Sequence, residues 1–239
     1  MSTALSPAYV LHSRPYRDSS ALVDLLTLHH GLQRVVWRGA RGQRRKLSPQ
    51  LFVPLLVGLL GRSELKTLTQ AEVAGPFTLL QGEQLFSGMY LNELLVRLLS
   101  TGDPQPLLFA AYQQVLEQLA SNAPVEPTLR RFEWQLLDVL GYGFSLSADA
   151  QGQPLNPQQG YVWHAGEGLL AVTDPLLAGA GMPGHALLAM AADDWTATTT
   201  LRAAKQLMRQ ALAVHLGGRP LVSRQLFARQ TPFIKGDEQ

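Results

Sequence analysis

The chain has 239 residues, of which 46% are hydrophobic and 16% charged, so it can bury a sizeable core and is not expected to be disordered. It contains no cysteine, which excludes a disulfide framework, a thiolate zinc site and a thiol nucleophile. The surplus of Lys and Arg lies in residues 1–75, where ten basic residues outnumber four acidic ones, and such a segment favours a polyanionic partner.

The start of the chain shows no targeting or membrane signal. Residues Met1 to Ala8 lack the basic start and the apolar core of a signal peptide. The longest apolar run, Leu51–Leu60, contains Pro54 and is too short to cross a bilayer. We therefore expect a soluble protein of the cytoplasm.

The N-terminal third is predicted to form a small β-barrel. Short runs rich in aliphatic and β-branched residues alternate with turn signals, and they predict strands at Ala8–Arg14, Ala21–Leu28, Leu32–Arg38, Phe52–Leu60 and Glu64–Val73. Gly31 and the turn from Gly61 to Ser63 favour two hairpins. Five short strands in a basic segment of this size are typical of an OB-fold.

A dense group of cations follows the third predicted strand. The segment from Arg38 to Lys46 holds five Lys or Arg residues and no acid, and Gly39 and Gly42 let its backbone turn. Like charges at this density repel one another unless a polyanion binds them, so we expect a DNA contact here, with a solvated loop as the alternative. The candidate DNA-binding residues are Arg14, Arg17, Arg34, Trp37, Arg38, Arg41, Arg44, Arg45 and Lys46.

Trp37 and the histidine pair His29 and His30 each allow a structural and a functional interpretation. Trp37 could stack on an unpaired base, although a Trp at the end of a strand more often packs in the core. His29 and His30 lie beside a predicted turn without acidic or His neighbours at metal-ligand spacing, so no metal site is assigned to them.

The middle of the chain is predicted to be helical. A mainly apolar helix covers Gly82–Ser100, a second begins with Asp103 as cap and Pro104, and a third runs from Pro127 to Leu140. We expect these three helices to form a bundle.

The C-terminal third combines an irregular region with a long helix. Residues 144–183 are rich in Gly and Pro, with short strands predicted at Tyr161–His164 and Leu169–Thr173. A long helix is expected at Trp195–Leu216, and Ser223 is expected to cap a last short helix through Gln230. The predicted fold is α+β: an OB-fold domain over residues 1–76 and a mainly helical domain over 77–239 that contains the irregular region.

Several short motifs, taken in their order, resemble the RecO family of bacterial DNA repair proteins. Two lie in the N-terminal third, Val10–Pro15 and Gly39–Arg41, and two in the predicted helices, Tyr90–Leu95 and Arg131–Gly143. Two more lie near the C-terminus, at Leu201–Lys205 and His215–Arg224. Each motif is weak alone, but together they span nearly the whole chain.

The resemblance implies an N-terminal OB-fold, a helical domain and a non-enzymatic recombination mediator. Such a protein binds single- and double-stranded DNA, anneals complementary strands, works with RecR and in some lineages RecF, and helps RecA load onto strands covered by single-stranded-DNA-binding protein. Many relatives carry four zinc-ligating cysteines in the irregular region. This chain has none, so neither zinc nor another cofactor is expected. Val222 stands where the family commonly has lysine, and no DNA contact is assigned to it.

The resemblance also implies a site for the acidic, hydrophobic C-terminal tail of single-stranded-DNA-binding protein. Such a tail needs cations for its carboxylates beside an apolar notch. The candidate residues are Arg130, Arg131, Arg202, Lys205 and Arg209.

Two other functional classes are kept as alternatives. A metal-dependent nuclease is disfavoured because the acids of the basic segment show no paired spacing and no Walker loop or nucleophile elbow is present. A scaffold whose basic loop binds an acidic protein surface is the second alternative. Such a scaffold would not give the steep salt dependence of DNA binding.

Overall fold

The structure is a computed structural model that describes residues 4–42, 47–76, 78–174 and 181–228. The chain divides into two compact units, of which the first combines Met1–Val125 with Pro220–Gln239 and the second is Glu126–Arg219. These compact units do not coincide with the predicted domains, whose boundary lies after residue 76. The predicted domain boundary stays a prediction.

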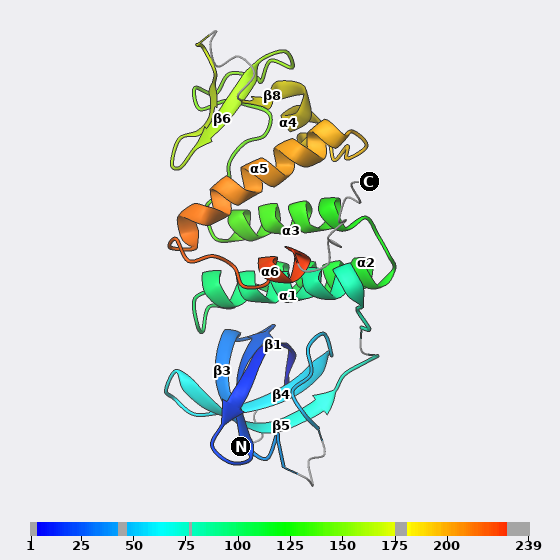
Figure 1. The fold of residues 1–239 in the computed structure, drawn as a ribbon. Helices are drawn as coiled ribbons and strands as arrows, with labels where there is room; N and C mark the ends of the chain where they lie inside the picture. Colours follow the sequence, from blue (N-terminus) through cyan, green and yellow to red (C-terminus); the bar gives the residue numbers. More distant parts are fainter. Residues whose placement is uncertain (1–3, 43–46, 77, 175–180, 229–239) are drawn as a thin grey trace, which may run out of the picture. The chain divides into compact units, whose positions relative to one another are not determined.

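The first unit begins with a closed five-stranded barrel, drawn from blue to cyan in Figure 1. Its strands are β1 (Ser6–Tyr16), β2 (Ser20–Thr27), β3 (Gly31–Trp37), β4 (Leu55–Leu60) and β5 (Leu65–Val73). They follow the order β1-β2-β3-β5-β4, with β4 paired to β1 to close the barrel and β3 parallel to β5. The predicted OB-like barrel is therefore confirmed.

The fourth strand starts three residues later than predicted. Pro54 has no N–H to give to the sheet, and Phe52 adopts a left-handed backbone with a φ of 63°, so pairing along β4 starts at Leu55. The side chain of Phe52 is still buried.

The barrel core is filled by alternating residues of the strands. Val10, Val23, Leu25 and Val35 are completely buried and pack with Trp37. Leu26, on the opposite face of β2, is also buried, so the second half of this strand is covered on both sides. This explains why β2 shows only weak alternation in the sequence.

Two helices, α1 (Gly82–Leu98) and α2 (Pro106–Ala120), belong to the same unit as the barrel. Buried Asn92 of α1 donates to the carbonyl oxygen of Leu11 at 3.0 Å and accepts from the Tyr112 hydroxyl at 2.6 Å. α2 begins at Pro106 rather than beside Pro104, because Thr101 still forms a bridge to Leu32 of β3 and the Gly102 N–H donates to the Leu32 carbonyl oxygen at 3.0 Å.

The chain returns to this unit after Pro220 and ends its described part in α6 (Arg224–Ala228). The Glu93 carboxylate on α1 accepts hydrogen bonds from the backbone N–H groups of Val222 and Ser223 and from the Ser223 hydroxyl, at 2.6–2.9 Å. Ser223 therefore precedes the helix as predicted, but its hydroxyl donates to Glu93.

The second unit contains α3 (Val125–Val139), β6 (Gly160–His164), β7 (Gly168–Ala171), β8 (Met182–Pro183), α4 (Gly184–Ala191) and α5 (Thr198–His215). The strands form a small sheet in the order β7-β6-β8. Phe132, Leu136, Leu207 and Met208 are fully buried in its core. The predicted three-helix bundle is thus divided, since nearly all of α3 falls in this unit while α1 and α2 fall in the first.

Across the described ranges, no helix combines the length and the hydropathy that crossing a bilayer requires.

Candidate nucleic-acid interface

The end of the β1–β2 hairpin presents exposed cations. Arg14 lies opposite Leu22 of β2, and its side chain is exposed. Arg17 occupies the turn with a φ of 50°, and its guanidinium carbon lies 5.1 Å from the centre of the Tyr16 ring. The half-buried Tyr16 ring thus supports a cation at this end of the barrel.

The described start of the β3–β4 loop lies against this same turn. The backbone N–H of Arg41 donates to the carbonyl oxygen of Ser19 at 2.9 Å, and its Nη1 donates to that of Arg17 at 3.4 Å. Gly39 has a φ of 68°, a left-handed conformation that only glycine adopts at little cost, and it lets the chain turn after exposed Arg38. Arg17 and Arg41 are therefore neighbours although the sequence separates them.

The remaining predicted cations of this loop are Arg44, Arg45 and Lys46. They lie outside the described residues. Their role in DNA binding stays a prediction.

Arg34 differs from the other predicted DNA contacts because its charge is already paired. Its Nε donates to Asp24 Oδ1 at 2.8 Å, across the register that places these two residues opposite each other on β3 and β2. His12 Nδ1 lies 3.4 Å from the other oxygen of the same carboxylate. Arg34 is therefore a weaker anchor for a phosphate than Arg14.

The suggested stacking role of Trp37 is wrong. Its side chain is only 7% exposed and belongs to the barrel core, because the inward alternation of β3 continues through Val35 to Trp37. No ring face is free for a base. The aromatic residue beside the cations is Tyr16, which the sequence analysis did not single out. Its position between Pro15 and Arg17 is the signal that could have identified it as a partner of the cations.

The turn between β2 and β3 holds His29 and His30. Burial, followed by the charges of Lys66 and His29, lowers the pKa of His30 and favours the neutral ring. Among the described residues, no group of three or more His, Cys, Asp or Glu side chains is arranged to hold a metal ion.

Three of the five cations predicted for the peptide site are paired within the second unit. Arg130, whose side chain is 10% exposed, forms an ion pair with buried Glu133, with Nη1 2.8 Å from Oε2, and Lys205 Nζ lies 3.1 Å from Glu126 Oε1. Arg131 makes two hydrogen bonds to Asp193, at 2.6 and 3.1 Å. Its guanidinium carbon also lies 5.4 Å from the centre of the Trp195 ring.

The other two cations of the predicted peptide site are Arg202 and Arg209. They lie two turns apart on α5, both are exposed, and neither has an ion pair in the described part of the chain.

Comparison with known proteins identifies the family. Residues 1–77 match the family model described as "Recombination protein O N terminal", and residues 79–225 match "Recombination protein O C terminal". A protein named DNA repair protein RecO in Pseudomonas paraeruginosa (strain DSM 24068 / PA7) is 54% identical over 224 residues, which cover 94% of each chain. The proteins of that name in Stutzerimonas stutzeri (strain A1501) and Pseudomonas putida (strain W619) are 55% and 50% identical and cover 92% and 94% of this chain, and 92% and 97% of their own. The chain therefore belongs to the RecO family of DNA repair proteins.

Proposed function

We propose that this chain is a recombination mediator that binds single- and double-stranded DNA without sequence specificity and anneals complementary strands. In this role it assists RecA loading onto DNA coated with single-stranded-DNA-binding protein, together with RecR and, where present, RecF. It does so without catalysis, in the cytoplasm where the chromosome lies. Family membership supports the repair role. The observation that carries the DNA contact is the gathering of exposed Arg17 and Arg41 at one end of the barrel.

The mechanism follows from the charge of the DNA backbone. Arg14, Arg17, Arg38 and Arg41 replace counterions around phosphates, and neutralised strands repel each other less. Phosphate contacts carry no sequence information and leave base edges free. Two strands held in this way can pair with one another, which is the annealing step.

The test compares two double variants that each remove two charges. Arg17→Gln with Arg41→Gln changes the barrel end, and Arg202→Gln with Arg209→Gln changes α5. For a labelled oligothymidine, the slope of log affinity against log salt should fall by about 1.4 in the barrel variant, near 0.7 per phosphate contact, and stay constant in the α5 variant. An unchanged slope in a folded barrel variant would reject the proposed interface.

The same pair of variants tests the second partner. We propose that Arg202 and Arg209 contact the acidic tail of single-stranded-DNA-binding protein. A synthetic peptide with that tail should then bind the α5 variant several-fold more weakly and the barrel variant with its normal affinity. If both variants bound the peptide equally well, the peptide site would lie elsewhere.

Annealing in the presence of a chelator separates the mediator from a metal-dependent nuclease. The mediator brings two strands together by charge neutralisation alone and should anneal without magnesium. Cleavage of the labelled strand that starts on addition of magnesium would favour the nuclease.

A further inference from the structure

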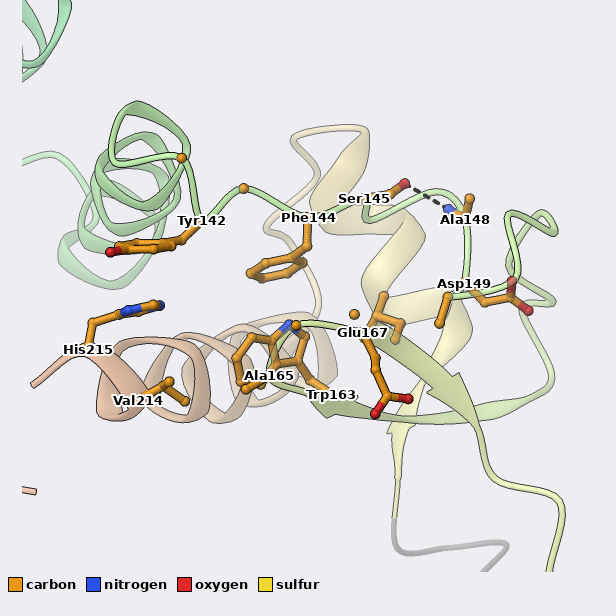
Figure 2. A pocket seen from close by; sticks show the side chains of 16 residues that line it. Tyr142, Phe144, Ser145, Ala148, Asp149, Trp163, Ala165, Glu167, Val214 and His215 are labelled. Carbon is orange, nitrogen blue, oxygen red and sulfur yellow. Dashed lines mark hydrogen bonds between the residues drawn. The ribbon is translucent and has the colours of Figure 1, made fainter. Parts of the chain in front are cut away.

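The second unit contains a pocket of about 480 Å³ that the DNA and peptide sites do not use. Figure 2 shows that it lies between the segment after α3, the turn between β6 and β7 and the end of α5. Its main side chains are Tyr142, Phe144, Trp163, Glu167, Val214 and His215. Tyr142 and Val214 are each about half exposed, so the pocket opens to solvent.

Aromatic rings hold the walls of this pocket in place. Phe144 stacks on Trp134 with ring centres 6.4 Å apart and contacts Trp163 at 5.7 Å. Tyr142 and His215 stack face to face at 3.7 Å, as the left side of Figure 2 shows. Rings that are fixed before binding lose little entropy when a ligand enters. Trp163 Nε1 is shielded from solvent and has no hydrogen-bond partner among the described residues.

The charged side chains that line the pocket are acidic, and the basic residues of α5, Arg202, Lys205 and Arg209, do not line it. Residues 132–201 contain seven Asp or Glu and no Lys or Arg. Two of these acids, Asp149 and Glu167, line the pocket. Asp149 Oδ1 accepts hydrogen bonds from the N–H groups of Gln151 and Gln153, whereas exposed Glu167 has no ion pair within the described ranges. Burial lowers the pKa of His215, which favours the neutral form of this ring.

We infer that this pocket binds an arginine side chain presented by a partner protein. Phe144, Trp163 and Glu167 line the pocket together. In the bound state the planar guanidinium stacks on Phe144 or Trp163, and its N–H groups donate to Glu167. Phosphates are excluded by the two carboxylates, so the occupant is not DNA. The inference concerns a different unit from the DNA contact and does not rest on the proposed function.

The test uses the full chain labelled with ¹⁵N in its tryptophan indoles. Trp163→Phe assigns the Trp163 indole signal, and the probe is the pentapeptide acetyl-Gly-Gly-Arg-Gly-Gly-amide. The signal should shift on titration with this peptide. The same peptide with citrulline, the neutral isostere of arginine, should bind at least about fivefold more weakly because it lacks the cation.

Two variants that each remove one negative charge test where the arginine peptide binds. Glu167→Gln should weaken binding of the arginine peptide about threefold, since it removes one exposed ion pair. Glu117→Gln, on the exposed side of α2, should leave it unchanged.

Three results would overturn the inference. One is equal binding of the arginine and citrulline peptides. A second is a shift of the Trp163 signal by oligothymidine instead of by the peptide. The third is self-association of the chain that Glu167→Gln abolishes while the peptide fails to bind, since the pocket would then serve a second copy.

Discussion

Asp24 sets how much positive charge the outer face of the barrel presents. Its carboxylate holds Arg34 at 2.8 Å and faces His12, so a cation that is 54% exposed is already compensated. Asp24→Asn keeps the shape and removes the charge. We expect higher affinity of the variant for oligothymidine and a salt slope steeper by about 0.7, because Arg34 becomes available to one phosphate. Fluorescence anisotropy across a salt series measures both.

Two arginine variants serve as the matched comparison for Asp24→Asn. Arg34→Gln in the native background should change the slope by much less than Arg14→Gln, whose charge has no ion pair in the described part of the chain. Equal effects of the two variants would show that Asp24 does not restrain Arg34.

At the residue scale, the sequence could predict which strand end carries the cations but could not predict their pairing. The Asp24–Arg34 pair depends on the register between two strands, which no local pattern shows. The burial of Trp37 depends in the same way on which face of β3 turns inward. Arg17 and Arg41 meet only because the barrel brings a turn and a loop together.

At the scale of elements, Glu93 joins α1 to the start of α6. Burial alone would raise the pKa of its carboxyl group, but the hydrogen bonds from Ser223 and Val222, together with Arg97, outweigh it and lower the pKa. A carboxylate whose folded pKa is depressed adds stability above its unfolded pKa, near 4.3, and loses it as the pH falls through the folded value. This contact is therefore fully formed at neutral pH.

Glu93→Gln should loosen the C-terminal segment without disturbing the barrel. The variant removes a charged acceptor of three hydrogen bonds, so we expect a loss of about 1–3 kcal/mol at pH 7. Hydrogen exchange should speed up at the amides of Val222 and Ser223. The loss should shrink as the pH falls below the unfolded pKa, near 4.3, and through the lower pKa of the folded carboxyl group. A loss independent of pH would point to packing instead of charge.

Helices and strands with a strong hydrophobic periodicity could be predicted from the sequence. The short helix α4 and the attachment of α6 to α1 could not. The five strands and α1, α2, α3 and α5 follow from their patterns, with shifts of one to three residues at most ends. The eight-residue α4 was missed because it starts after Pro183 without a side-chain cap. Attachment of α6 to α1 rests on contacts far apart in sequence, which composition does not reveal.

At the scale of the whole molecule, the first unit is built from two separate pieces of chain. The returning piece contributes buried Leu221 and the ring of Phe227, which packs against Phe86 at 6.0 Å. A chain that ends at Arg219 should therefore lose about 3 kcal/mol or more from the first unit. The second unit lies wholly within the residues that remain.

Tryptophan signals can follow the two units separately during urea unfolding. Trp37 reports on the barrel, while Trp134, Trp163 and Trp195 lie in the second unit. Truncation at Arg219 should lower the urea midpoint of the Trp37 signal and leave the other three midpoints in place. If all four moved together, the two units would unfold as one.

The split first unit also has a consequence for the order of events on the ribosome. The barrel, α1 and α2 are translated early, yet their last partners appear only after residues 126–219 have been made. At about 5–20 residues per second, this leaves the nascent first unit without α6 for roughly 5–20 s. During that interval the surface of α1 around Phe86 and Glu93 is uncovered, and the second unit can fold before the first is finished.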